Sequence, residues 1–354
     1  MSEPSPTPTP DTPPPGSTGE IGLDGAALAQ LLHQELPHLE IGQLQIELIA
    51  GGRSNLTYRI GDGRHRWILR RPPLGHVLAT AHDMAREYRV MSALGPTAVP
   101  VPEVVLLHDD SAAIGAPFYL MKEVAGTVYR TRADTDRLGP QRAHAISYRL
   151  IDAMAELHQV EPQAVGLDNF GNPRDYLGRQ IRRWSKQLAA SHSRPLPDLE
   201  RLRELLAAAT PGDRRGTVIH GDYRLDNTLI AGESVAAVVD WELSTVGDPL
   251  ADLGLFAAYW DGLPDVPGNP LAGGVHPAAG FASSTELLHR YSDHTGTDLS
   301  DMAWYLAFGF FKVAAILEGI HFRYRQGQTV GDGFDTIGTL VEPIAAQGLA
   351  ALSS

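Results

Sequence analysis

Apolar and polar positions alternate along three runs that follow residue 40, "QLQIELIAGG", "NLTYRIGDG" and "HRWILRRPP". Such alternation predicts half-buried strands, and the junctions that contain glycine favour antiparallel hairpins. The next segment, "HDMAREYRVMSAL", has helical spacing, because Met84, Tyr88, Met91 and Leu94 fall on one face. Two more strand-like runs, "VPVPEVVLLHDD" and "PFYLMKEVAG", follow it. We therefore predict a small antiparallel sheet with one inserted helix, preceded by an amphipathic helix over residues 24–36.

From about residue 140 the spacing becomes mainly helical. The runs "RAHAISYRLIDAMAELHQV", "YLGRQIRRWSKQLAASH" and "DLERLRELLAAA" each predict a helix. Three short strand-like runs come next, "TVIHGD", "NTLIAG" and "VAAVVDW", and the last third is mostly helical. Within it, "GFFKVAAILEGIHF" is expected to be a core helix, too short and too charged to span a membrane. The pattern predicts an α+β fold with a β-rich lobe over residues 21–124 and a larger helical lobe over residues 125–354.

Composition narrows the classes of function. Residues 1–20 are rich in Pro, Ser and Thr and predict a disordered tail without the features of a signal peptide. The formal charge of -13 disfavours nucleic acid as a partner, because an acidic surface repels phosphate backbones. With no cysteine, disulfides, thiolate catalysis and cysteine-bound metals are excluded. We expect a cytoplasmic protein that does not bind membranes, and the pattern does not predict an oligomeric state.

The stretch "TVIHGDYRLDNTLI" carries the strongest chemical signal. Its strand-like ends flank His220, Gly221 and Asp222, and Asn227 stands at the head of the second strand. The later run "VVDWE" places Asp240 at the end of a third strand, and the short turn "AGES" makes the last two strands neighbours. Asn227 and Asp240 can then face one cavity beside Asp222, with oxygen atoms that suit Mg²⁺. The alternative is that Asp222 and Asn227 only cap a turn.

The pattern "HGDYRLDN…VVDWE" resembles the phosphotransferases of the aminoglycoside and choline kinase group, which are relatives of the protein kinases. Protein kinases carry His-Arg-Asp with Asn five positions after the Asp, followed by Asp-Phe-Gly. Here the spacing is the same, while Gly221 replaces the Arg and Asp240-Trp241-Glu242 replaces Asp-Phe-Gly. The run "WILRRPPLGHVLATAHDMAREYRVMSAL" also resembles the kinase-like domains related to those fused to some acyl-CoA dehydrogenases. The resemblance covers roughly residues 25–345 and implies a protein-kinase-like bilobal fold.

The resemblance implies roles for the residues of the central stretch. ATP and Mg²⁺ would be the cofactors, with Asn227 and Asp240 as the metal ligands. Asp222 would be the catalytic base, or at least the group that orients the acceptor hydroxyl. His220 is expected to brace the loop by hydrogen bonding.

The resemblance also assigns nucleotide contacts upstream. In "IAGGRSNLTYRI", Gly51, Gly52, Ser54 and Asn55 form a turn that can bring backbone N–H groups close to phosphates. Alone, such a turn is more often only a hairpin connection.

Arg70 in "WILRRPP" occupies the position of the usual phosphate-binding Lys, and Glu87 would pair with it. The alternatives are an exposed arginine on an edge strand and a solvated glutamate on a helix surface. Arg71 should point to the other face of the strand.

The connector "LMKEVAG" is expected to hold adenine, with Met121 at the back of the pocket and the backbone of Lys122 and Val124 at the adenine edge. Downstream, Asp248 and Asp252 are expected to brace the loop after the metal site, with Asp252 capping a helix. The basic run "RQIRRWSK" is either a solvated helix face or one wall of the acceptor pocket.

The leading hypothesis is an ATP-dependent phosphotransferase that acts on a hydroxyl of a small molecule. Aminoglycoside, macrolide, choline-like, sugar-like and hydroxyacyl acceptors all fit. The acidic composition favours a cationic acceptor, whereas the narrower resemblance favours hydroxyacyl compounds. Two alternatives belong to other classes: a nucleotide-binding pseudokinase or regulatory scaffold without transfer activity, suggested by Arg70, and a Mg²⁺-dependent phosphohydrolase.

Overall fold

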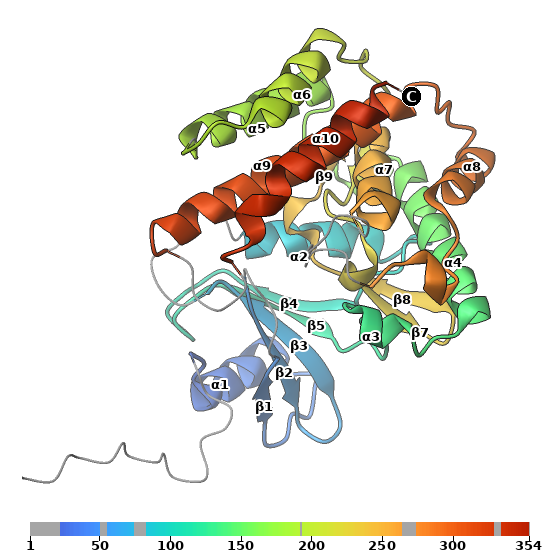
Figure 1. The fold of residues 1–354 in the computed structure, drawn as a ribbon. Helices are drawn as coiled ribbons and strands as arrows, with labels where there is room; N and C mark the ends of the chain where they lie inside the picture. The colour runs from blue at the N-terminus through green and yellow to red at the C-terminus, as the bar shows by residue number, and fades with distance from the viewer. Residues whose placement is uncertain are drawn as a thin grey trace, which may run out of the picture. The chain divides into compact units, whose positions relative to one another are not determined.

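The chain forms two compact units, which are drawn in Figure 1. The computed structural model describes residues 22–49, 55–73, 83–191, 193–263, 274–328 and 334–353. The first unit comprises Met1–Ala85 and Val104–Glu123, and the second comprises Arg86–Glu103 and Val124–Ser354. The predicted tail over residues 1–20 lies outside the described residues.

Among its described residues, the first unit contains helix α1 and a five-stranded antiparallel sheet. The helix is α1 (Gly25–Glu35), and the strands are β1 (Gln45–Leu48), β2 (Leu56–Gly61), β3 (Arg66–Arg71), β4 (Val104–His108) and β5 (Phe118–Lys122). Their order in the sheet is β1-β2-β3-β5-β4. Each strand coincides with a strand-like run that the sequence predicts, and α1 coincides with the predicted amphipathic helix, so the pattern located this sheet correctly.

Packing of α1 on the sheet forms the core of the first unit. Asp24 caps the helix, because its carboxylate accepts from the backbone N–H groups of Ala26 and Ala27. The buried leucines of α1 then join aromatic side chains of the sheet in one apolar cluster, which includes Leu28, Leu32, Tyr58, Trp67 and Phe118. Burial of these side chains supplies the main stabilising contribution to the unit.

The position of β3 excludes the alternative of an exposed arginine on an edge strand. β3 lies in the middle of the sheet, between β2 and β5. Arg71, at its end, is buried, and its guanidinium donates to the carbonyl oxygens of Gly22 and Ile114. Burial lowers the pKa of Arg71, and the nearby Tyr58 partly offsets that effect. Arg71 therefore supports the fold of the first unit.

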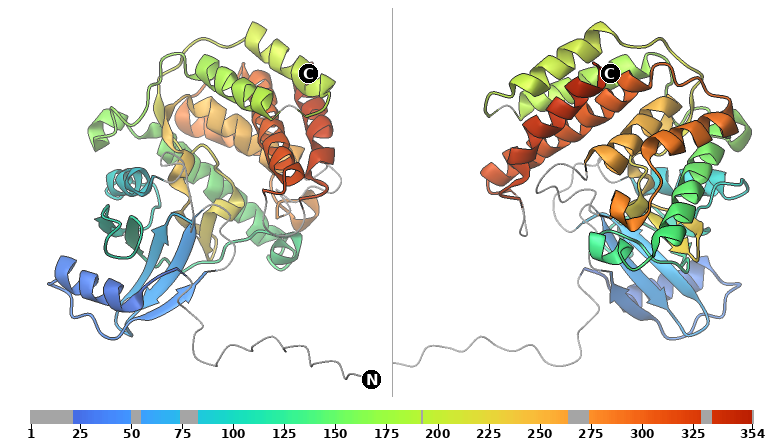
Figure 2. Two further views of the ribbon diagram at one scale, coloured as in Figure 1. Left: turned by 90° about the vertical axis from the view of Figure 1, so that its left-hand side faces the viewer. Right: turned by 45° about the vertical axis from the view of Figure 1, so that its right-hand side comes forward.

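The second unit is mostly helical. The first two residues of helix α2 belong to the first unit, and its other residues belong to the second. The helices are α2 (Met84–Leu94), α3 (Arg132–Thr135), α4 (Pro140–Gln159), α5 (Tyr176–Ala190), α6 (Pro197–Ala208), α7 (Pro249–Ala257), α8 (Ser284–Thr295), α9 (Met302–Arg325) and α10 (Val341–Ala351). The pair α5 and α6 packs beside the pair α9 and α10, as the two views of Figure 2 show.

Two two-stranded sheets among the described residues of this unit flank the residues with the predicted chemistry. β7 (Thr228–Ala231) pairs with β8 (Ser234–Val238), as the short turn between them predicts. β6 (Thr217–Ile219) pairs instead with β9 (Thr245–Gly247), a strand that the sequence pattern did not predict. Pairing of β6 with β9 brings the segment after Asp240 back beside the strand that leads into His220.

Helix α9 is long and apolar enough, by length and composition alone, to cross a membrane. The expectation that this segment is too short and too charged is therefore wrong. Its placement in the core is confirmed, because 72% of its most apolar window is buried inside the protein. It packs against α7 and α10, and it runs the length of the helical unit in Figure 1.

Candidate active site

The loop between β6 and β7 requires glycine at its centre. Gly221 has a φ of +84°, in the region that side chains with a Cβ rarely adopt. A Cβ at this position would also lie 2.6 Å from the carbonyl oxygen of Leu243. The replacement of the protein-kinase arginine by Gly221 therefore follows from the backbone path of the loop.

Polar side chains hold the carboxylate of Asp222 in one orientation. Asn227 donates through Nδ2 to Asp222 Oδ2 at 3.0 Å and to the Asp222 carbonyl at 2.8 Å. The Nε of Arg224 lies 3.3 Å from Oδ2, and the hydroxyl of Tyr259 also bonds to the carboxylate. Burial, followed by the negative charge of Asp222, raises the pKa of Tyr259. A half-buried carboxylate fixed in this way can orient an acceptor hydroxyl and accept its proton.

Arg224 offsets the charge of two carboxylates in this loop. Its Nη1 lies 3.1 Å from Asp226 Oδ2, in addition to its contact with Asp222. Burial acts to lower the pKa of Arg224, but Asp222 and Asp226 outweigh burial, so the net shift is upward. Its guanidinium also lies 5.3 Å from the centre of the Tyr259 ring. Arg224 is thus a charged member of the site that the sequence motif did not single out.

His220 braces the loop, as its position in the motif predicts. Its Nδ1 accepts from the backbone N–H of Asp222 at 3.2 Å, and its Nε2 donates to the carbonyl of Val239 at 2.9 Å. These two bonds require the neutral tautomer with the proton on Nε2. The ring packs against Trp241, with ring centres 4.7 Å apart. His220 therefore connects the residue before Asp240 to the backbone of Asp222.

Asp240 has a backbone conformation that fits a functional position. It lies just after β8 with φ 70° and ψ 56°, in the left-handed region. Such a conformation costs on the order of 1 kcal/mol or more for a residue with a side chain, although Asp and Asn tolerate it best. The backbone N–H of Val239 bonds to the carbonyl of Asn227 at 2.9 Å, so Asp240 follows a residue tied to Asn227. The structure thus brings Asp222, Asn227 and Asp240 together through one hydrogen-bonded system.

The donor set of Asn227 and Asp240 fits Mg²⁺. The Asn227 amide directs its NH₂ to Asp222, which leaves its oxygen as the end that can bind a cation. Mg²⁺ in phosphate-transfer sites takes one or two protein oxygen ligands and completes its shell with water and phosphate oxygens. Among the described residues, no group of three His, Asp or Glu side chains could hold a metal by itself. Two protein ligands are too few for a resident structural ion, but they suit a metal ion that binds together with a nucleotide.

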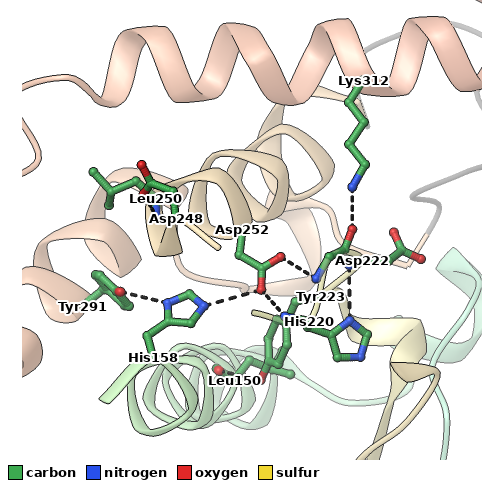
Figure 3. A network of polar contacts seen from close by, with 11 residues as sticks. Leu150, His158, His220, Asp222, Tyr223, Asp248, Leu250, Asp252, Tyr291 and Lys312 are labelled. Atoms are coloured by element: carbon green, nitrogen blue, oxygen red, sulfur yellow. Dashed lines mark hydrogen bonds and ion pairs between the residues drawn. The ribbon is translucent and has the colours of Figure 1, made fainter. Parts of the chain in front are cut away.

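A buried network supports the loop on the side of α7, and Figure 3 shows its contacts. The carboxylate of Asp252 accepts from the backbone N–H of His220 at 2.6 Å and of Gly221 at 2.7 Å. His158 lies 3.4 Å from the same carboxylate through Nε2 and bonds to the Tyr291 hydroxyl through Nδ1 at 2.8 Å. Burial acts to raise the pKa of Asp252. The His158 contact and the loop N–H group outweigh burial, so the pKa of Asp252 is lowered overall. Asp252 therefore holds the loop as an ionised, fully bonded carboxylate.

The helix cap lies at Asp248 rather than at Asp252, which corrects the sequence prediction. Asp248 accepts from the N–H of Leu250 at 3.0 Å at the start of α7, whereas Asp252 lies in the first turn of the helix. Asp248 also accepts from the hydroxyl of Tyr305 at 2.7 Å. The cap is shifted because Pro249, which is suited to the first turn of a helix, follows Asp248 directly.

Lys312 contacts the loop, although the sequence pattern placed it only in a core helix. It extends from α9 and donates from Nζ to the carbonyl of Gly221 at 2.6 Å, as seen in Figure 3. Burial lowers its pKa, while the negative charges of Asp222 and Asp252 oppose that effect. The available signal was a single cation within an otherwise apolar stretch, "YLAFGFFKVAAIL". A lone charge on an apolar helix commonly marks a specific partner.

Of the residues predicted to bind phosphate or to support that contact, the structure describes Asn55, Arg70 and Glu87. Gly51, Gly52 and Ser54 lie outside the described residues, whereas Asn55 is buried just before β2. Arg70 lies in β3, opposite Thr57 on β2 and Tyr119 on β5. Glu87 lies in the first turn of α2 and is 1% exposed, so it is not a solvated surface glutamate. Their contacts with a nucleotide remain predictions.

The predicted adenine-binding segment begins at the end of β5. Met121 is buried and pairs with Ile68 in the sheet, and Lys122 is exposed opposite Trp67. Val124 follows, half-buried, beyond the strand. Between them, Glu123 accepts from Arg59 at 2.7 Å and from Arg66 at 2.6 Å, which fixes the end of the strand. The backbone contacts with adenine remain predictions.

Comparison with known proteins supports the resemblance found in the motifs. A model described as "Phosphotransferase enzyme family" matches residues 45–291. Acyl-CoA dehydrogenase family member 10 of Mus musculus is 37% identical over 344 residues, which cover 95% of this chain and 32% of that protein. Acyl-CoA dehydrogenase family member 11 of Homo sapiens is 32% identical over 352 residues, which cover 95% of this chain and 45% of that protein. The chain therefore spans less than half the length of these curated relatives.

Solved structures confirm the predicted fold class. A crystal structure from Ralstonia eutropha, provisionally assigned as an aminoglycoside phosphotransferase, has a TM-score of 0.81 at 32% identity and covers 94% of this chain and 98% of its own. An aminoglycoside 2'-phosphotransferase solved as a GDP complex has a TM-score of 0.61 at 17% identity and covers 93% of this chain and 100% of its own. The second likeness shows the fold alone. Both agree with a protein-kinase-like α+β fold.

Proposed function

Because the chain belongs to the phosphotransferase enzyme family, we propose that it is a kinase-like enzyme that moves the γ-phosphate of ATP to a hydroxyl group of a small molecule. The observation that carries this proposal is the hydrogen-bonded system that joins Asp222, Asn227 and the residue before Asp240. A turn that only needed capping would not require a carboxylate, an amide and a strained aspartate in one system.

The proposed reaction is an in-line displacement in which the chain mainly positions groups and balances charge. The acceptor oxygen forms a bond to the γ-phosphorus, the bond from that phosphorus to the ADP oxygen breaks, and the hydroxyl proton passes to the Asp222 carboxylate. Asn227 and Arg224 keep that carboxylate oriented before the transfer. Lys312 and Asp252 fix the adjoining Gly221 peptide from two sides.

Asn227 and Asp240 would hold Mg²⁺ in this proposal, and the bound ion would neutralise charge on the nucleotide phosphates. His220 contributes indirectly, because its bond to the Val239 carbonyl fixes the backbone just before Asp240. Asn227 couples the two parts of the site, since its NH₂ group binds Asp222 and its oxygen would face the cation.

Asp240→Asn tests the proposal without disturbing the backbone, because Asn tolerates the left-handed conformation about as well as Asp. The unfolding of wild type and variant should be measured with Mg²⁺ and either ATP or GTP, since one relative was solved with GDP. A nucleotide at a hundred times its Kd stabilises a protein by about 2.7 kcal/mol. We expect that stabilisation in the wild type and little or none of it in the variant.

The matched control is Asp175→Asn, which changes the other described non-glycine residue with positive φ, on the surface at the start of α5. Nucleotide stabilisation should persist in this control. Equal stabilisation of the wild type and Asp240→Asn would remove Asp240 from the metal site. No stabilisation by either nucleotide would contradict the proposed donor.

The second candidate function is a nucleotide-binding scaffold that transfers no phosphate. The arginine at position 70, where the resembling kinases carry lysine, favours this candidate. The two candidates differ in one measurement, which is the release of ADP in the presence of a panel of hydroxyl compounds. Nucleotide binding without release for any compound would favour the scaffold, and reproducible transfer to one compound would reject it.

A further inference from the structure

A cavity of about 280 Å³ lies against the catalytic loop within the second unit. Gly221, which immediately precedes Asp222, is one of its lining residues. Helix α5 contributes Arg179, Arg183 and Trp184, and α9 contributes Lys312. We call this space the Gly221 cavity. Its volume suits part of a small molecule rather than a single ion.

The charges that line the Gly221 cavity are strongly unbalanced. Four cationic side chains, Arg86, Arg179, Arg183 and Lys312, face one carboxylate, that of Glu242. The chain as a whole has the opposite sign, with 29 Lys and Arg against 42 Asp and Glu. A local excess of cations in an acidic protein is therefore a property of this wall and not of the composition.

Most of these cations lack a carboxylate partner. Within the described part of the chain, Arg179, Arg183 and Lys312 form no ion pair with Asp or Glu, although Arg179 donates to the carbonyl of Asn172. Two nearby arginines are paired by contrast: Arg182, next to Arg183 on α5, binds Asp175, and Arg194 binds Glu318. Three cations without a carboxylate partner thus line the same cavity.

Arg86 has a different role in the same wall. It donates to the carbonyls of Phe170 at 2.7 Å and Ser244 at 2.9 Å, and it lies 3.9 Å from the centre of the Phe170 ring. These bonds hold the segment after Asp240 in place. Arg86 therefore adds to the positive potential while Arg183 and Lys312 supply the more available charge.

Arg183 and Lys312 lie close enough to influence each other. After burial, the positive charge of Arg183 is the other influence that lowers the pKa of Lys312. Both cations lie near the Trp184 ring, at 5.4 Å and 5.8 Å from its centre. The indole N–H of Trp184, which is 5% exposed, has no acceptor among the described residues. Like charges beside an unused donor are what an anion would stabilise.

We propose that the Gly221 cavity binds an oxyanionic group of the acceptor, a carboxylate or a phosphate, while a hydroxyl of the same molecule reaches Asp222. This inference rests on the proposed phosphotransfer and narrows the acceptor to hydroxylated anions. Lys312 joins the two parts of the site, because its Nζ bonds to the carbonyl of Gly221, one residue before Asp222. A cationic acceptor would meet like charge in this cavity. The basic run of α5 is then a wall of the acceptor pocket.

Arg183→Gln is the principal test, because Arg183 is exposed and its loss leaves no buried group unpaired. Lys186→Gln is the matched control, since it removes another exposed cation of α5 that does not line the cavity. Binding of inorganic pyrophosphate and of succinate should be measured by calorimetry with EDTA present and without nucleotide. We expect at least one probe to bind the wild type and the control, and to bind Arg183→Gln about tenfold more weakly or worse.

The two probes distinguish a phosphate from a carboxylate as the preferred group. Failure of both probes to bind would overturn the inference, and so would equal affinity in Arg183→Gln. These outcomes do not depend on any transfer activity.

A kinetic arm tests the acceptor itself. ω-Hydroxyalkanoates, ω-hydroxyalkyl phosphates and neutral ω-hydroxyalkanamides of matched length should be compared for ADP release. We expect an anionic series to exceed the amides in kcat/KM by about tenfold or more, and Arg183→Gln to remove that preference through KM.

Transfer to neutral or cationic hydroxyl compounds that Arg183→Gln leaves unchanged would overturn this inference but keep the proposed function. A rise in KM for MgATP alone would assign the cavity to the nucleotide and also overturn it. Absence of nucleotide binding in the wild type would instead contradict the proposed function.

Discussion

Two aspartates on either side of the Gly221 peptide show how one residue type serves different purposes. Asp252, beneath the loop, is buried, and it accepts from two backbone N–H groups and lies within bonding distance of His158. Asp222 is half-buried, and its carboxylate is held by the side chains of Asn227 and Arg224. A carboxylate whose lone pairs are committed to the backbone fixes structure, whereas one held by side chains keeps an oxygen for chemistry.

Replacement of Asp222 should give the largest effect, and it should act on activity. Asp222→Asn removes the proposed proton acceptor, so we expect kcat to fall by about 10²–10⁴-fold. The free energy of unfolding should change by about 1 kcal/mol or less, because Arg224 keeps Asp226 as a partner. Steady-state kinetics and urea unfolding together check this result. Near-normal turnover in a folded variant would end the catalytic assignment of Asp222.

Replacement of Asp252 should act on stability instead, and the effect should depend on pH. Asp252→Asn should lower the free energy of unfolding by about 2–4 kcal/mol at pH 7, because charged hydrogen bonds to the loop are lost. The folded pKa of Asp252 is lowered, so its stabilising contribution is complete above the unfolded value near 4 and declines as pH falls through the folded value.

Urea unfolding across acid pH should therefore show the gap between wild type and Asp252→Asn closing as the solution is acidified. The exposed Asp168→Asn serves as the control and should change stability by about 0.5 kcal/mol or less. A gap that stays constant down to the lowest accessible pH would show that ionised Asp252 does not support the loop.

A pair of glycine variants isolates a steric effect on the same loop. Gly221 and Gly232 both have positive φ, +84° and +63°, but a Cβ would clash only at Gly221, with the Leu243 carbonyl. Gly232→Ala should cost about 1 kcal/mol from backbone conformation alone. Gly221→Ala should cost about 1–3 kcal/mol more, because the loop must shift to admit the methyl group. Equal unfolding free energies would show that the close approach to Leu243 is not needed.

The stretch that contains Asp222 and the Gly221 cavity also differ in how much of them the sequence could predict. The helix and strand order, the spacing from Asp222 to Asn227 and the position of Asp240 after its strand follow from local periodicity and short motifs. These features depend on neighbours within a few residues, which is the range over which propensity and pattern act. The bracing role of His220 was also predictable, because it depends on residues two and nineteen positions away in the same motif.

The sequence by itself determined most of the elements, the phosphotransferase motif and the candidates for proton transfer and metal binding. Only the tertiary structure decided that Asp252 supports the loop from 31 positions away and that Lys312 reaches Gly221 across 91 positions. The same applies to the pairing of β6 with β9, since short strands far apart in the chain find partners through packing. Net charge predicted a cationic acceptor, whereas the wall beside Asp222 is cationic. The physical reason is that composition averages charge over the chain, while the field at a site depends on which side chains the fold brings there.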